Sequence, residues 1–199
     1  LLATASTHQS TVFMVAHAAL AAFLARMSGT GDIAVGTPVA GRGEAALDDV
    51  VGMFVNTVVL RTVVSDADRF SDLLDQVRDV DLAAYAHAEV PFEKVVEALD
   101  PPRSTAHSPL FQVLLEFQNV ERPDLSLPGV EVHGIDLGAT IARFDLQLTL
   151  AEEYTDDGTP AGITAGFAYA TDLFDAETGA GLAVRVVPVR DTAVTSPAV

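Results

Sequence analysis

Two long stretches of this chain are rich in apolar residues and predict helices. The first is a nearly continuous apolar run from residue 12 to residue 25, interrupted at His17. It predicts a mostly buried helix over Thr11–Met27, and Ser28-Gly29 should end that helix because glycine tolerates the left-handed conformation at a helix C-terminus. In the second stretch, Asp68–Tyr85, apolar residues fall at i, i+3, i+4 and i+7, which predicts an amphipathic helix.

Two further helices are predicted, and one of them is weak. A helix over Pro91–Leu99 would begin with proline in its first turn and end at Asp100-Pro101-Pro102. A closing helix over Asp175–Arg190 contains residues that disfavour helix interiors, namely Gly179, Gly181 and Pro188. We therefore expect this helix to be short or frayed, with disorder from about Thr192.

The other apolar segments predict β-strands. A short strand over residues 32–36 precedes Thr37-Pro38, and the β-branched stretch Val50–Val64 should be a strand buried on both faces. A weaker strand is expected at 130–132. Alternation of apolar and polar residues predicts strands with one buried face over Leu110–Asn119, Phe144–Ala151 and Ile163–Tyr169. Together the elements predict the α+β class, a mixed β-sheet with packed helices.

The charge of the chain restricts its partners. Its formal net charge is −17, from 28 acidic and 11 basic residues. Such a surface repels phosphate backbones and anionic lipid headgroups, so we expect neither nucleic acid nor membrane as a partner. The apolar run at 12–25 is also shorter than the roughly 20 residues needed to span a bilayer.

The chain offers little chemistry of its own. It contains no cysteine, which excludes disulfides, thiolate metal sites and a cysteine nucleophile and is consistent with a cytoplasmic protein. Its five histidines form no zinc-binding pair, and no G-x-S-x-G motif is present. We therefore predict no metal site and no catalytic residue in this sequence.

Asn56 and Thr57 are polar residues within an apolar strand. A buried amide must find hydrogen-bond partners. Two interpretations follow: a structural network within the core, or a polar group that lines a substrate channel.

Three segments, in order along the chain, resemble the motifs of one enzyme family. Residues 51–61 read V-G-M-F-V-N-T-V-V-L-R, similar to a G-x-F-V-N-T strand that ends in arginine. Residues 87–93 (H-A-E-V-P-F-E) and 103–113 (R-S-T-A-H-S-P-L-F-Q-V) are similar to H-x-x-x-P-F-E and R-x-x-x-x-x-P-L-F-Q-V. These are motifs of the condensation domains of nonribosomal peptide synthetases. Weaker similarities extend the resemblance over roughly residues 11–175, at 32–42, 143–146 and 169–175.

The resemblance implies a chloramphenicol-acetyltransferase-like lobe. Condensation domains contain two such lobes, which form a V around a substrate tunnel. Residues 1–175 would be the C-terminal lobe, followed by a weak closing helix and a disordered tail over 176–199. Because the sequence opens at Leu1 rather than methionine, we expect a piece of a longer protein.

The resemblance also implies a reaction and its partners. An aminoacyl amine would attack an aminoacyl or peptidyl thioester and release a phosphopantetheine thiol. The implied partners are the N-terminal lobe, the donor and acceptor carrier proteins and an adjacent adenylation domain. No cofactor would be bound directly, since the carrier proteins deliver phosphopantetheine.

One departure from the family limits what this chain could do. The catalytic signature of the family, two adjacent histidines followed by aspartate and glycine, belongs to the N-terminal half and is absent here. His133-Gly134-Ile135-Asp136 does not reproduce it. The resemblance therefore implies that the fragment is inactive alone.

The resemblance assigns roles to single positions. Asn56 would line the tunnel near the reacting thioester, with Thr57 in support. Glu93 and Arg103 would anchor loops by charged hydrogen bonds. Structural roles are implied for Gly52, Phe54, Arg61, Pro91, Phe92, Glu93, Arg103 and Pro109.

Three alternatives share the expected fold or chemistry. The first is a non-catalytic condensation-like platform that recruits carrier proteins or partner enzymes. The second is an epimerisation domain, although F-V-N-T at 54–57 and P-F-E at 91–93 resemble condensation domains more closely. The third is a free-standing acyltransferase with a soluble thiol donor.

Overall fold

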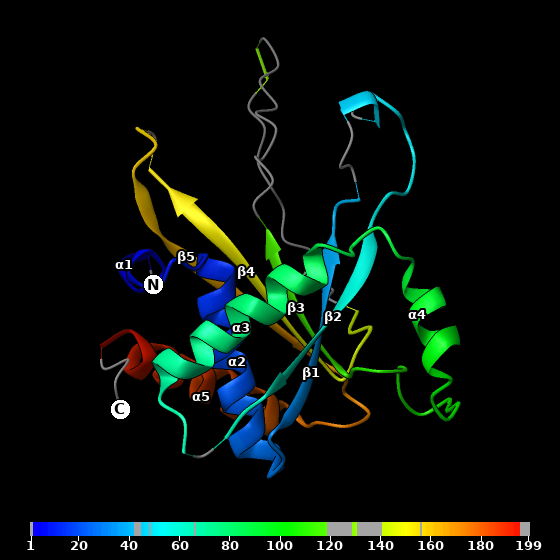
Figure 1. Cartoon of the computed structure of the whole chain (residues 1–199). Helices are drawn as coiled ribbons and strands as arrows, with labels where there is room; N and C mark the ends of the chain where they lie inside the picture. The colour runs from blue at the N-terminus through cyan, green and yellow to red at the C-terminus, as the bar shows by residue number, and fades with distance from the viewer. Residues whose placement is uncertain are drawn as a thin grey trace.

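A five-stranded mixed sheet forms the centre of the chain (Figure 1). The computed structural model describes residues 2–41, 45–47, 49–65, 67–118, 129–130, 141–155 and 157–195. The strand order is β2-β1-β3-β4-β5. The strands are β1 (Asp32–Val39), β2 (Asn56–Val63), β3 (Val113–Gln118), β4 (Leu146–Tyr154) and β5 (Pro160–Tyr169).

Both strand orientations occur in this sheet. β1 pairs with β2 and β4 with β5 in antiparallel ladders, whereas β3 is parallel to β1 and to β4. The helices are α1 (Leu2–Thr7), α2 (Val12–Ser28), α3 (Phe70–Tyr85), α4 (Phe92–Leu99) and α5 (Ala176–Thr195), with a short 3-10 turn at Ala45–Leu47. The predicted α+β class, a mixed sheet with packed helices, is confirmed.

Helix α2 begins and ends as its sequence predicts. The Thr11 hydroxyl accepts a hydrogen bond from the Met14 amide, which satisfies one of the unpaired donors of the first turn. Gly29 ends the helix at φ 70°, and its amide donates to the Ala25 carbonyl. A helix apolar on most sides needs neighbours on most sides, and α2 packs against β1, α3 and α5.

Two hydrophobic clusters hold the helices on one face of the sheet, called here the helical face. The first joins α2, the sheet and α5, and it includes Phe23, Val35, Leu115, Leu148 and Leu182. The second joins α1, α2 and α3, and it includes Met14, Val15, Leu73, Leu74 and Val77. Helix α4 lies apart from this layer, beside β2 (Figure 1).

The prediction for Val50–Val64 is wrong in extent and in burial. β2 begins at Asn56, and the preceding Val51 and Met53 are 100% and 91% exposed. Within β2, Val58, Leu60 and Thr62 are buried and alternate with more exposed residues. β2 is an edge strand with helices on one face, and β-branched residues suit such a strand as well as a fully buried one.

The closing helix is longer than predicted, since a short or frayed helix was expected. α5 spans 20 residues and continues past Thr192 to Thr195. The Asp175 carboxylate accepts a hydrogen bond from the Thr178 amide at its start. A β-carbon at Gly179 would lie 2.3 Å from the Tyr169 ring, so the glycine allows α5 to pack on β5. This packing offsets the low helix propensity of glycine.

Other predictions fall partly outside the described residues. Of the weak strand at 130–132 only Val130 is described, where it forms an isolated β-bridge. His133 to Asp136 lie outside the described residues, as does Asn119. None of the helices in the described ranges has the length and apolar composition needed to cross a membrane.

Candidate functional site

A cavity of about 940 Å³ opens on the sheet face opposite the helical face. Side chains of a strand alternate between the two faces, and Leu115 and Leu148 belong to the helical core. Leu114, Glu116 and Gln147 therefore point the other way, and all three line the cavity. The remaining walls come from residues 53–57, the turn between α3 and α4, the start of α4 and residues 141–144.

Asn56 joins β2 to the turn before α4. Its Nδ2 donates to the carbonyls of Ala88 at 2.8 Å and Val90 at 2.7 Å, and its Oδ1 accepts from the Phe92 amide at 3.1 Å. The last bond satisfies an unpaired donor in the first turn of α4. The amide of Asn56 therefore has hydrogen-bond partners at the edge of the sheet rather than in the core, and Asn56 also lines the cavity. Both amide protons are used, which leaves only an oxygen lone pair for another partner.

Thr57 follows Asn56 on the cavity wall. In the β1–β2 ladder it lies opposite Pro38, which also lines the cavity. The two tunnel residues suggested by the sequence thus border one cavity.

The loop between β1 and β2 requires glycine at position 41. Gly41 has φ +65°, and a β-carbon there would lie 1.8 Å from the Phe54 carbonyl oxygen. A β-carbon at Gly52 would lie 3.2 Å from the Phe54 ring. Phe54 also lines the cavity, so the close approaches of Gly41 and Gly52 to this residue lie at its edge.

Three phenylalanines pack together beside the cavity, and two of them, Phe92 and Phe144, line it. The ring centroids of Phe92 and Phe111 are 5.7 Å apart, and those of Phe111 and Phe144 are 5.0 Å apart. Phe111 lies directly over Gly36, where a β-carbon would be 2.2 Å from the ring. Pro91 precedes the first turn of α4, and the Pro109 carbonyl accepts from the Phe111 amide at 2.9 Å. The P-F-E and P-L-F-Q-V motifs therefore meet in one aromatic cluster.

Arg61 lies away from the cavity. Its guanidinium donates two 2.8 Å hydrogen bonds to the Asp32 carboxylate on the neighbouring strand. These hydrogen bonds and the charge of Arg61 hold the pKa of Asp32 below its usual value. Both side chains are exposed, so this pair contributes little to stability.

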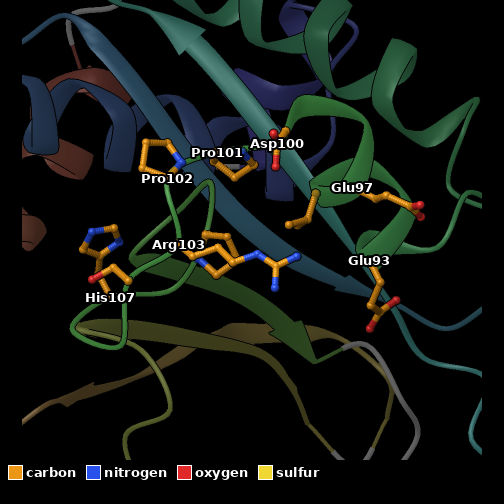
Figure 2. A pocket seen from close by; sticks show the side chains of 10 residues that line it. Glu93, Glu97, Asp100, Pro101, Pro102, Arg103 and His107 are labelled. Atoms are coloured by element: carbon orange, nitrogen blue, oxygen red, sulfur yellow. The ribbon is translucent and has the colours of Figure 1, made fainter.

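Glu93 and Arg103 line a second cavity of about 360 Å³ between α4 and the following loop. Figure 2 shows the Arg103 side chain between α4 and His107, with Glu97 and Glu93 on α4. Within the described part of the chain, neither Glu93 nor Arg103 forms an ion pair or a side-chain hydrogen bond, so their predicted anchoring has no support there.

A buried polar cluster was not foreseen. His17 Nδ1 and Asp81 Oδ1 are 2.9 Å apart, and both side chains are fully buried between α2 and α3. Burial, together with the charge of Asp81, raises the pKa of Tyr85, and a hydrogen bond with Thr37 acts in the opposite direction. His17 interrupting an apolar run was the available signal, but no pattern in the sequence identified its partner 64 residues away.

The sequence pattern marked Glu116 only as part of the more polar face of a predicted strand, and not as a site residue. Its Oε2 accepts a hydrogen bond from Gln147 Nε2 at 3.2 Å, and its side chain is half-buried on the cavity wall. Among the described residues, no group of three His, Cys, Asp or Glu side chains could hold a metal ion.

Comparison with known proteins decides the family. The sequence pattern of the family described as Condensation domain matches residues 1–199. The chain belongs to the condensation domain family. It is 48% identical over 197 residues to the probable non-canonical nonribosomal peptide synthetase CymA of Salinispora arenicola. It is 44% identical over 193 residues to the dimodular nonribosomal peptide synthase of Bacillus subtilis.

This condensation-domain chain spans a small part of those relatives. The matches cover 99% and 97% of the chain but only 2% of CymA and 8% of the B. subtilis synthase. The X-domain from teicoplanin biosynthesis has a similar structure, with a TM-score of 0.84 and 30% identity over 97% of this chain and 43% of that one. The four-domain synthetase AB3403 shares the fold, with a TM-score of 0.85 and 23% identity over 98% of this chain and 16% of that one. The predicted chloramphenicol-acetyltransferase-like fold is confirmed.

Proposed function

We propose that this chain is the C-terminal lobe of a condensation domain that forms amide bonds between carrier-bound aminoacyl or peptidyl thioesters. Residues 1–175 would form its body, closed by α5. The observation that carries the proposal is the cavity on the face opposite the helical face, because residues of two family motifs, including Asn56 and Phe92, line it.

The exposed residues around this cavity suit contact with a second lobe. Met53 and Ile141 both line the cavity, and they are 91% and 83% exposed. Apolar groups gathered beside a cavity are typical of a surface that another protein part covers. An N-terminal lobe on this face would cover the open cavity, and the residues that line the cavity would then form one wall of a tunnel.

In this reaction the acceptor amine attacks the thioester carbonyl of the donor. A C–N bond forms, the C–S bond breaks, and the phosphopantetheine thiol leaves with a proton from the amine. The chain lacks the adjacent histidines of the family, so a base would come from the N-terminal lobe. The chain itself would orient both tethered substrates and exclude water, and such positioning lowers a barrier by several kcal/mol.

Asn56 would act as a positioning residue in this scheme. It fixes the turn at 88–90 and the first amide of α4, both on the cavity wall. In the complete domain, we expect Asn56→Ala to lower kcat by at least about tenfold, because a displacement of 1 Å can cost about a hundredfold in rate. The loss of stability should be smaller, about 1 kcal/mol, whereas a tenfold loss of rate corresponds to about 1.4 kcal/mol.

The measurement is formation of the condensed product from two loaded carrier proteins, followed by mass spectrometry and paired with urea unfolding. Thr62→Val is the matched control. It changes a hydroxyl of the same strand that is buried on the helical face and has no hydrogen-bond partner in the described chain, so the rate should not change. Unchanged turnover in Asn56→Ala would contradict the assigned role.

A second candidate function is a platform that recruits partner proteins without catalysis. A solved complex of the X-domain and OxyB from teicoplanin biosynthesis favours it, since that X-domain is 31% identical to this chain with a TM-score of 0.80. A complete domain that binds loaded carriers but releases no amide product would support the platform.

A further inference from the structure

Glu116 places a carboxylate on the proposed tunnel wall. It lies on β3 opposite Thr149 of β4, on the cavity side of the sheet. Its side chain is half-buried, whereas the other lining carboxylates, Glu89 and Glu93, are exposed. Glu116 is therefore the carboxylate of this cavity that water solvates least.

Among the described residues, the side chains that donate hydrogen bonds to the Glu116 carboxylate are all neutral. Gln147 Nε2 donates to Oε2 at 3.2 Å and Gln118 Nε2 donates to Oε1 at 3.3 Å. Gln147 is itself oriented by the Thr149 hydroxyl at 3.4 Å. Arg143 also lines the cavity, but it is exposed and forms no ion pair with Glu116.

A partly desolvated carboxylate without a counter-ion favours a cationic partner. An ionised carboxylate can accept about four hydrogen bonds, and among the described residues Glu116 accepts two side-chain hydrogen bonds, both from neutral donors. An aliphatic group bound there would remove water from Glu116 without replacing its hydrogen bonds, which is unfavourable. An ammonium or guanidinium group would instead form a charge-assisted hydrogen bond.

We propose that Glu116 selects an aminoacyl group whose side chain carries an ammonium or guanidinium group. The proposal rests on the condensation function proposed above. The reacting α-amine is the less suitable partner, because the amine must lose its proton before it attacks a thioester, and a carboxylate bound to it would favour the protonated form. Recognition of the side chain does not oppose the reaction.

The test compares a cationic and a neutral aminoacyl group of similar shape in the complete condensation domain. Ornithinyl and norleucyl groups are loaded in turn on the donor and on the acceptor carrier, and kcat/KM is measured for each. In one of the two positions we expect the wild type to prefer ornithinyl by at least about tenfold. In Glu116→Gln the preference should fall to within about twofold, while Glu116→Asp should retain most of it.

Glu153→Gln is the matched control, because it removes one carboxylate from neighbouring β4 outside the cavity. It should leave the preference unchanged. Equal preference in the wild type and Glu116→Gln would overturn the proposal. So would an equal loss of rate for both substrates with a lower melting temperature, which would mean that Glu116 pairs with a cation of the other lobe. Absence of product with every substrate would instead contradict the condensation function itself.

Discussion

At the residue scale, the most consequential finding is the buried pair of His17 and Asp81. Both side chains have no exposed surface, and His17 Nε2 and Asp81 Oδ2 lack hydrogen-bond partners in the described chain. Each side chain therefore depends on the other for its main polar contact. Removal of one would leave an uncompensated polar group between α2 and α3.

Asp81→Ala is expected to lower the free energy of unfolding by about 3–5 kcal/mol, since it breaks a buried pair on one side. Asp79→Ala is the control on the same helix, because that carboxylate is 76% exposed and, within the described part of the chain, pairs only with Arg78. It should cost less than about 1 kcal/mol. Urea unfolding of both variants tests the expectation, and equal effects would show that the buried pair is not important for stability.

A second prediction concerns the pKa of Asp32. Arg61 lowers it through two hydrogen bonds, so the pair stabilises the fold above the unfolded-state pKa of Asp32 and loses that contribution as pH falls through the folded-state pKa. Arg61→Gln should move the carboxyl titration, followed by NMR, up toward the usual aspartate value. Asp157, whose pKa is lowered mainly by Thr155, is the internal control and should not move.

At the scale of elements, Gly36 determines how the aromatic cluster meets the sheet. A β-carbon there would overlap the Phe111 ring, and Phe111 contacts both Phe92 and Phe144. The substitution would therefore disturb α4 as well as β1. Overpacking of this kind costs about 1–3 kcal/mol.

We expect Gly36→Ala to lower the free energy of unfolding by that amount and to lower turnover in the complete domain. Gly181→Ala is the matched substitution in α5, where a β-carbon meets nothing within 4 Å. It should raise the stability by about 0.5–1 kcal/mol, because alanine favours a helix over glycine. Thermal unfolding of the two variants should give shifts of opposite sign.

The starts of three helices could be predicted from the sequence more closely than the limits of β2. α2, α3 and α4 begin within two residues of their predicted starts, since an N-cap threonine, a helical period and a proline mark them locally. The limits of β2 and the length of α5 depend on contacts with β1 and Tyr169, which no local pattern records. Among the site residues, Asn56 stood out as a polar residue in an apolar run, whereas Glu116 looked like any residue of a polar strand face.

At the scale of the whole molecule, one face of the sheet carries the helical core and the other carries the cavity. Two exposed apolar residues, Met53 and Ile141, line that cavity. The chain also spans only 43% of the X-domain chain that it matches. Together these observations support the view that the second face functions in contact with another lobe.

Separation of the two lobes tests directly whether both are needed for amide-bond formation. The chain, the N-terminal lobe and their equimolar mixture are each given donor and acceptor carriers loaded with aminoacyl groups, and amide product is measured by mass spectrometry. We expect product only when both lobes are present, at a rate that falls on replacement of the paired histidines of the N-terminal lobe. Product from this chain alone, or none from the intact two-lobed domain with its histidines in place, would contradict it.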